Sequence, residues 1–416
     1  MGNDLVHMNS LLIITPFFPY PIRSGGEQGQ FNMIDALREK YHISIVFPIN
    51  KDNHIEDVNA AASIWPKVKF FPYSKKDQYL YLPFLIQKGK RFLNRVMNPS
   101  KRKKKIINAL GSTDFLVSNR YRKFLDQVIT EVKPDIVQVE FIQNLNVVNV
   151  LPESILKLFV HHEIGFVITD RSLENVELKS CEKTWKEKKK KQEIERLNKY
   201  DVIITVTETD KQILLKSGVN VPIHASPSAV NTKEKEYAGW NNELVFVGGY
   251  NHMPNHEGVN WFLQYVTPLV KWDNYPNVVL KIIGSGWPQS YERTFNGLYV
   301  HLLGYVDDLS DEAYKCIMIV PLLTGSGMRM KILDAASLSL PFVATSVGAE
   351  GLEFVNGKSC LIGNSPREFA EALMKVMSDE SFRKDIAIQA HQLYVNQYSL
   401  KSLTERRDKI YMDLLS

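Results

Sequence analysis

Short apolar segments alternate with amphipathic segments along the whole first half of the chain. The apolar segments are rich in β-branched residues and have no polar face, as expected for parallel strands covered on both sides. They span residues 11–15, 43–47, 68–72, 136–139, 156–160 and 202–206. Between the first two, residues 28–41 place Phe31, Ile34, Leu37 and Tyr41 at helical spacing. This half therefore predicts a parallel sheet with helices between its strands.

The second half repeats the pattern. Its strand candidates span residues 244–247, 279–283, 300–303, 316–320, 342–345 and 360–362, and helical patterns cover residues 259–269 and 366–377. Two rounds of strand–helix alternation predict two doubly wound α/β domains. The polar segment 226–242 is the expected linker. Ligands of such sheets bind beyond the carboxyl ends of the strands, which predicts a binding cleft between the domains.

Composition fits a two-domain soluble protein. The chain has 416 residues, 44% of them hydrophobic and 23% charged, which is enough for two cores. Its three cysteines show no metal-ligand spacing, so neither a zinc site nor a disulfide framework is predicted. The apolar run at residues 11–18 lacks a basic leader and is interrupted by proline, and no stretch reaches the roughly 20 apolar residues of a membrane span. A cytoplasmic location is expected.

One segment, residues 324–335 (TGSGMRMKILDA), combines a glycine-rich turn with a predicted helix. The turn consists of Gly325, Ser326 and Gly327. Arg329 and Lys331 follow among the first residues of that helix, and helix-start amides with two cations suit a diphosphate. Asp334 lies further along and can accept hydrogen bonds from ribose hydroxyls. On spacing alone, a turn before a surface helix with solvated cations is the alternative.

This segment and the run LSLPFVATSVGAEGL after it closely resemble retaining glycosyltransferases of family 4, in the subgroup with a GSG-x-R-x-K motif. The motifs FVGG (residues 246–249), IIGSG (282–286) and GYVDDL (304–309) follow the order and intervals of that family's donor-binding domain. The resemblance covers nearly all of the second half. It implies a GT-B fold, in which two Rossmann-like doubly wound domains face each other across a cleft, and transfer from a nucleotide-diphosphate sugar without metal or cofactor.

The resemblance also assigns residues to the donor. Arg329 and Lys331 would clamp its diphosphate and act as catalytic residues. The other donor contacts would be Gly25, Gly26, Gly248, Gly249, Tyr305, Val306, Gly325, Ser326, Gly327 and Asp334. Two positions depart from the family pattern. Asp334 stands where the family has a ribose-binding glutamate, and Ser326 where the commoner pattern has a sugar-binding glutamate, so sugar specificity does not transfer.

The first half matches the family more weakly, as expected of an acceptor-binding domain. Gly25 and Gly26 match a glycine turn facing the donor phosphates; the alternative is a strand–helix turn that needs positive φ. Glu140 is placed at the carboxyl end of a predicted strand and is a tentative acceptor contact.

Two histidines and a glutamate follow the strand at residues 156–160. The family has a histidine and an acidic residue there, which map onto His162 and Glu163. His162 is then a catalytic residue near the reacting carbon, and Glu163 a tentative acceptor contact. A satisfied pair of strand-end histidines is the alternative. No metal site is predicted, because no third ligand is placed nearby.

From Lys88 to Lys105 the chain carries nine basic and no acidic residues, with aromatic residues before and among them. Such a stretch suits an anionic membrane surface. The protein could therefore be cytoplasmic and attached peripherally to the inner face of the membrane. A second basic run lies at residues 183–191. Nucleic acid is not an expected partner, since no recognition module accompanies the charge. A solvated basic face is the alternative.

Taken together, the sequence predicts an acceptor domain at residues 1–230, a donor domain at 241–395 and a final helix within 396–416 that crosses back to the first domain. The reaction would transfer a sugar with retention to a saccharide or lipid-linked acceptor, in surface polysaccharide or glycolipid assembly. Two rivals remain open: a nucleotide-sugar epimerase of GT-B architecture, and a non-catalytic nucleotide-sugar-binding partner of another transferase. Asp334 and Ser326 keep the second rival open.

Overall fold

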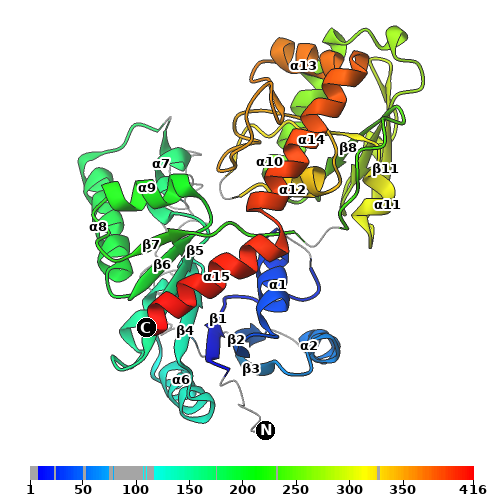
Figure 1. The fold of residues 1–416 in the computed structure, drawn as a ribbon. Coiled ribbons are helices and arrows are strands. Elements are labelled where there is room, and N and C mark those ends of the chain that lie inside the picture. Colours follow the sequence, from blue (N-terminus) through cyan, green and yellow to red (C-terminus); the bar gives the residue numbers. More distant parts are fainter. Residues whose placement is uncertain are drawn as a thin grey trace, which may run out of the picture. The chain divides into compact units, whose positions relative to one another are not determined.

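The computed structural model describes residues 8–22, 25–49, 53–74, 78, 106, 109, 117–174, 176–230, 233–325 and 328–416. They form two compact units, coloured by sequence in Figure 1. The first unit comprises Met1–Ser226 and Glu405–Ser416, and the second comprises Pro227–Thr404. Each unit contains its own seven-stranded sheet.

The sheet of the first unit is parallel at every recorded pairing, in the order β3-β2-β1-β4-β5-β6-β7. Its strands are β1 (Ser10–Ile14), β2 (His42–Ile49), β3 (Lys69–Ser74), β4 (Ile136–Glu140), β5 (Leu156–His161), β6 (Val202–Thr205) and β7 (Ile223–Ala225). The strand order reverses between β1 and β4, so the crevice beyond their carboxyl ends is where a doubly wound sheet binds ligands. The six predicted strands are confirmed; β7, with three residues, was too short to predict.

Helices connect these strands. They are α1 (Gly25–Leu37), α2 (Asn53–Ile64), α6 (Asn119–Val132), the 3-10 helix η1 (Ile142–Asn149), α7 (Gly165–Leu173), α8 (Ser180–Leu197) and α9 (Glu208–Lys216). The last helix, α15 (Leu400–Leu415), contributes residues from Glu405 onward to this unit. Three hydrogen bonds hold that part of it. Asp408 accepts hydrogen bonds from Lys40 Nζ (2.6 Å) and Tyr41 Oη (2.7 Å), and Tyr411 Oη donates to Gln138 Oε1 (2.5 Å).

The second sheet has the order β10-β11-β9-β8-β12-β13-β14, and β10 alone pairs antiparallel in it. Its strands are β8 (Glu243–Val247), β9 (Val279–Ile283), β10 (Thr294–Phe295), β11 (Leu298–Gly304), β12 (Ile317–Val320), β13 (Phe342–Ala344) and β14 (Leu361–Ile362). The six strands predicted for this half are confirmed. The prediction missed β10, which has only two residues.

The helices of this unit are α10 (Met253–Trp261), a π turn η2 (Phe262–Val266), the 3-10 turns η3 (Thr267–Leu269), η4 (Trp272–Asn274) and η5 (Gln289–Tyr291), α11 (Leu309–Ala313), α12 (Met330–Ser337), α13 (Pro366–Ser378) and α14 (Glu380–Gln397). The helix predicted at residues 259–269 begins six residues earlier, at Met253. Pro254 sits in its first turn, where a missing N–H costs nothing, so proline is compatible with this helix start.

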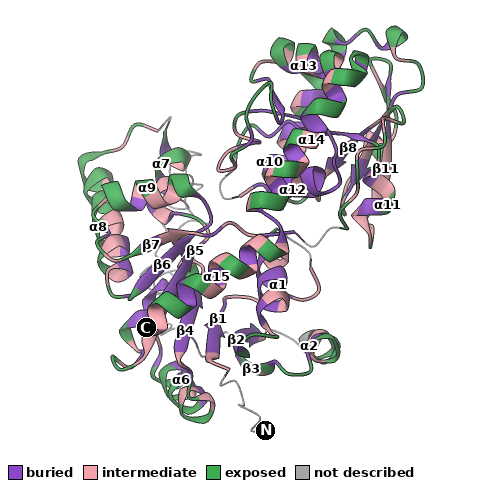
Figure 2. Ribbon diagram, in the orientation of Figure 1, coloured by how far each residue is buried: buried purple, intermediate pink, exposed green. Residues whose placement is uncertain are grey.

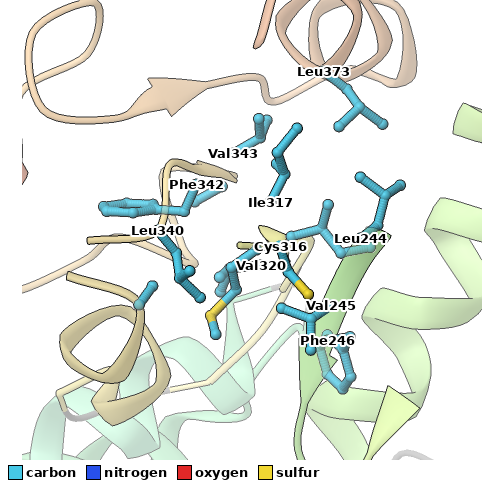
Figure 3. Packing of buried hydrophobic residues seen from close by; sticks show 14 of the residues in the cluster. Leu244, Val245, Phe246, Cys316, Ile317, Val320, Leu340, Phe342, Val343 and Leu373 are labelled. Atoms are coloured by element: carbon cyan, nitrogen blue, oxygen red, sulfur yellow. The ribbon is translucent and has the colours of Figure 1, made fainter. Parts of the chain in front are cut away.

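Both sheets lie at the centre of their units, as Figure 2 shows by the buried strands and the exposed outer faces of helices such as α6. Figure 3 shows the core of the second unit, where side chains of β8, β12 and β13 meet Leu373 of α13. Leu244, Ile317, Val343 and Leu373 are all fully buried. Strands buried on both faces explain why the sequence shows uninterrupted apolar runs rather than alternation.

Candidate functional site

Glycines end two neighbouring strands of the second unit. Gly248 follows β8 with φ +151° and Gly284 follows β9 with φ +139°, and a Cβ on Gly284 would lie 2.5 Å from the Gly248 carbonyl. The two backbones therefore touch at the carboxyl edge of the sheet. A larger residue at position 284 would force them apart, and one at position 248 would clash with the Asn255 side chain. The predicted position of Gly248 and Gly249 at a strand end is confirmed; their contact with a donor stays a prediction.

Lys331 is held against this glycine pair by Asn255, a buried residue of α10. Asn255 Nδ2 donates to the Gly249 carbonyl at 2.9 Å, and its Oδ1 accepts a hydrogen bond from Lys331 Nζ at 2.9 Å. The same ammonium lies 4.4 Å from the centre of the Phe246 ring, within range of a cation–π interaction. Asn255 thus fixes both the loop and the cation. This role of Asn255 was not predicted from the sequence, because there Asn255 is only a polar residue that follows Pro254.

The surroundings of Lys331 disfavour its charge. Burial lowers the pKa of Lys331, the nearby Arg329 guanidinium lowers it further, and Asp334 opposes both, which leaves the pKa at about 7. Near pH 7 only about half of the molecules then carry the ammonium. A bound anion would restore the charge, so anion binding at this position is coupled to proton uptake.

Arg329 lies beside Lys331 but not inside the helix. It is the residue before α12, which begins at Met330, so the prediction that both cations lie within the helix is wrong for Arg329. Its Nε donates to the Val347 carbonyl (3.1 Å), and its guanidinium lies 3.9 Å from the Glu350 carboxylate. Gly325, at φ +129°, lies so close that a Cβ there would be 3.2 Å from the guanidinium. The turn therefore needs glycine for its conformation, and a larger residue would also press against the end of the Arg329 side chain.

Four further predicted donor residues belong to this unit. Asp334 is buried in α12, one turn after Lys331 and so on the same helix face. Tyr305 and Val306 follow β11, and Tyr305 is 67% exposed, which leaves its ring open to stacking. Gly249 takes part in the loop held by Asn255. Ser326 and Gly327 lie outside the described residues.

In the first unit, Glu140 and His162 form a close pair at the carboxyl ends of β4 and β5. Glu140 is 1% exposed, and its Oε2 lies 2.5 Å from His162 Nε2. Its other oxygen accepts a hydrogen bond from Gln138 Nε2 at 2.5 Å. Both carboxylate oxygens are thus engaged within the protein. The predicted strand-end position of Glu140 is confirmed, but nothing in this arrangement tests its contact with an acceptor.

Phe141 separates Glu140 from η1 in a rare backbone conformation, with φ +65° and ψ +146°. This region is almost exclusive to glycine, and a phenylalanine held there costs about 1–3 kcal/mol. The ring of Phe141 stacks on His162 with centroids 3.8 Å apart and planes at 8°. A Cβ on Gly26 would lie 3.6 Å from the same ring. The structure therefore brings Gly26, Phe141 and His162 together.

The prediction of a glycine turn at Gly25 and Gly26 is wrong, because these residues are helical. Both residues belong to the first turn of α1, and neither is among the glycines with positive φ. Glycine pairs are typical of turns, but at a helix start the helical hydrogen bonds outweigh that tendency. Their proposed proximity to donor phosphates stays a prediction.

His161 and Glu163 differ from His162. His161 is buried, with its Nε2 3.4 Å from Glu193 Oε1, and Glu193 also accepts the N–H groups of Gly165 and Phe166 at the start of α7. Both ring nitrogens of His161 are buried and, among the described residues, neither makes a hydrogen bond, so the alternative of a satisfied strand-end histidine does not hold for His161. Glu163 is exposed. Its contact with an acceptor stays a prediction.

The described residues contain neither a metal-binding cluster nor a membrane-spanning helix. No group of three or more His, Cys, Asp or Glu side chains among them could hold a metal ion, and no helix in that part of the chain is long and apolar enough to cross a bilayer. The basic stretch from Lys88 to Lys105 lies outside it. The second basic run lies on α8, where Lys186 pairs with Asp170 at 2.7 Å and Trp185 is 55% exposed.

Comparison with known proteins finds a family whose model matches part of the second unit. Residues 241–379 match the model of a family described as Glycosyl transferases group 1. A protein from Klebsiella pneumoniae, named as an uncharacterized 44.6 kDa protein in cps region, is 28% identical over 212 residues. That match covers 49% of this chain and only 53% of the relative.

Solved structures match over nearly the whole chain. TarM aligns with a TM-score of 0.67, covering 99% of this chain and 100% of its own. Sucrose-phosphate synthase from Thermosynechococcus elongatus scores 0.66 (98% and 99%), and Anabaena Alr3699/HepE, solved with UDP and glucose, scores 0.64 (98% and 100%). Sequence identity is 12% in each case, so the likeness establishes the fold alone. The fold is GT-B, as predicted.

Proposed function

We propose that this protein is a retaining glycosyltransferase that takes a sugar from a nucleotide-diphosphate donor. The observation that carries the proposal is Lys331, a cation fixed by Asn255 beside the glycine pair Gly248 and Gly284, with a pKa near 7. A partly buried lysine that gains its full charge only with an anion nearby suits a diphosphate. The match of residues 241–379 to a glycosyltransferase family supports this assignment.

The proposed reaction breaks the bond between the anomeric carbon and the donor phosphate oxygen. The bonding electrons leave with the nucleoside diphosphate, and the acceptor hydroxyl forms the new bond on the same face of the sugar. Its proton passes to the departing phosphate oxygen. Arg329 and Lys331 would stabilise the charge that develops on that oxygen. His162 would hydrogen-bond a sugar hydroxyl of donor or acceptor, Asp334 the ribose, and Tyr305 would stack on the base.

The comparisons support a choice of donor and acceptor classes to test. Anabaena Alr3699/HepE was solved with UDP and glucose, which makes uridine nucleotide-sugars the first donors to test. The Klebsiella pneumoniae relative is named for a cps region, which supports a saccharide or lipid-linked acceptor in surface polysaccharide assembly. The match covers about half of that relative, so this assignment is ours and not a transferred property.

The first prediction tests the activity itself. Purified protein mixed with the correct nucleotide-sugar, without acceptor and with excess chelator, is expected to release nucleoside diphosphate and free sugar slowly. Arg329 and Lys331 supply the positive charge, so the rate should stay within about twofold of that without chelator. A thermal-shift screen identifies the donor, because a ligand at a hundred times its Kd stabilises by about 2.7 kcal/mol.

Three other outcomes would contradict parts of this proposal. Loss of activity that manganese or magnesium restores would refute metal independence. Conversion of the donor sugar to its epimer without release of sugar would identify an epimerase. Tight donor binding with no turnover of any acceptor or of water would identify a non-catalytic binding partner, the alternative that Asp334 in place of glutamate keeps open.

The second prediction concerns the membrane. We propose that the basic stretch from Lys88 to Lys105 attaches the enzyme to anionic lipid, since each cation near such a surface contributes about 1 kcal/mol. The protein should sediment with vesicles rich in anionic lipid at low salt and be released near 1 M salt, where the Debye length falls to about 3 Å. Replacing residues 101–105 by serine should weaken binding at least tenfold. Equal binding to neutral vesicles would refute the proposal.

A further inference from the structure

A chain of three hydrogen bonds in the first unit ends at His162. It starts at Tyr411 on the final helix, whose hydroxyl donates to Gln138 Oε1 at 2.5 Å. Gln138 Nε2 donates to Glu140 Oε1 at 2.5 Å, and Glu140 Oε2 meets His162 Nε2 at 2.5 Å. Tyr411, Gln138 and Glu140 are buried, whereas the His162 side chain keeps 14% exposure. The only member that reaches solvent is therefore the histidine.

The direction of each bond is fixed by chemistry. Burial raises the pKa of the Tyr411 hydroxyl to about 12, so this group stays protonated and donates to Gln138. The carbonyl oxygen of Gln138 must face that hydroxyl, which turns its NH2 group toward Glu140. That NH2 group donates to Glu140 Oε1, which leaves Glu140 Oε2 to meet His162. Glu140 then accepts from His162, so the proton sits on Nε2 and the lone pair on Nδ1.

The ring of His162 is also fixed in orientation. It lies flat on Phe141, which is itself held at φ +65°. Backbone strain of this kind persists only where surrounding contacts determine it, and it gathers at functional sites. Among the residues that the structure describes, His162 has no hydrogen bond besides the one to Glu140. Its Nδ1 is thus available to accept a hydrogen bond from a sugar hydroxyl.

We propose that Glu140 is a positioning residue, rather than an acceptor contact, which together with Gln138 and Tyr411 holds His162 in the Nε2–H tautomer with Nδ1 presented to substrate. This proposal rests on the proposed function, because His162 must meet donor or acceptor for its tautomer to affect the rate. It replaces the direct acceptor contact that the sequence predicts for Glu140. Partners that orient a metal-bound histidine contribute tenfold to a hundredfold to metal affinity or activity, and we expect the same range for Glu140.

The test is Glu140→Gln, followed by ¹⁵N NMR of histidine-labelled protein, with the His162 signals assigned from His162→Gln. The new amide oxygen should face Gln138 Nε2, which leaves an NH2 group facing His162 Nε2. His162 is then expected to switch to the Nδ1–H tautomer. Turnover should fall tenfold to a hundredfold, whereas donor Kd should stay within about twofold. Tyr411→Phe keeps the carboxylate but frees Gln138, so it should lower turnover less and mix the two tautomers.

Glu193→Gln is the matched control, since it alters the neighbouring buried pair with His161. It is expected to destabilise the fold without changing the His162 tautomer. If Glu140→Gln leaves His162 in the Nε2–H form and raises the acceptor KM, Glu140 touches the acceptor and the proposal is overturned. An unchanged turnover with a switched tautomer overturns it as well. If Glu140→Gln does not fold, the His162 tautomer and the turnover of Tyr411→Phe test the proposal instead.

The tautomer measurement needs no substrate, so it separates this inference from the proposed function. Wild-type protein that shows the Nε2–H tautomer, lost in Glu140→Gln, would support the pairing even if no nucleotide-sugar were turned over. In that case the proposed function would fail and the positioning of His162 would stand. Transfer activity together with an Nδ1–H tautomer in the wild type would support the proposed function and overturn the positioning of His162.

Discussion

Lys331→Ala is expected to lower turnover about a hundredfold or more. The ammonium would act on charge that develops as the leaving group departs, so its contribution should be larger in the transition state than in the bound donor. Donor affinity should fall less, because contacts to the nucleoside remain. Binding of the diphosphate near pH 7 should take up about half a proton in the wild type, as a pKa near 7 requires, and much less in the variant. Calorimetry in buffers of different ionisation enthalpy measures this uptake.

An exposed lysine of the same unit provides the control for this substitution. Lys271→Ala removes a cation of equal charge and should leave both turnover and proton uptake unchanged. Wild-type turnover in a well-folded Lys331→Ala protein would rule out the diphosphate assignment. An unfolded variant would instead show that the hydrogen bond to Asn255 and the contact with Phe246 are structural.

His162→Ala should lower turnover by tenfold to a hundredfold while leaving donor Kd nearly unchanged. A hydrogen bond to a group that gains charge contributes about 1.5–3 kcal/mol, and each 1.36 kcal/mol corresponds to a factor of about ten in rate. Single-turnover kinetics separates the chemical step from binding. His42→Ala, an exposed histidine at the start of β2, should have no effect. A large loss of donor affinity with normal turnover would mean that His162 serves binding rather than the reaction.

The sheets could be predicted because their strands are buried on both faces. Runs such as Ile317–Val320, which is buried at every position, carry that signal in their own composition. Shorter elements gave no such signal, which is why β7 and β10 were missed. The start of α1 also differs from the prediction, because Gly25 and Gly26 belong to the first turn of that helix rather than to a glycine turn.

The partners of the candidate site could not be predicted, because they lie far away in the sequence. Asn255 binds Lys331 across 76 positions, and Gln138 binds Tyr411 across 273. A lone asparagine or glutamine among apolar residues indicates only that some partner exists, since a buried amide must be hydrogen-bonded. The motif residues Arg329 and Lys331 could be named from the sequence. The groups that set their charge and position required the fold.

The division of the first unit into two chain segments affects how the protein is made. A ribosome adds residues at about 5–20 per second, so Gln138 is synthesised on the order of ten seconds or more before Tyr411, the residue that completes its hydrogen bonds. The whole second unit is synthesised in that interval. During translation the surface that later receives Glu405–Ser416 stays open, with the buried amide of Gln138 hydrated. The hydrogen bonds that hold His162 are therefore completed only after the second unit has been synthesised.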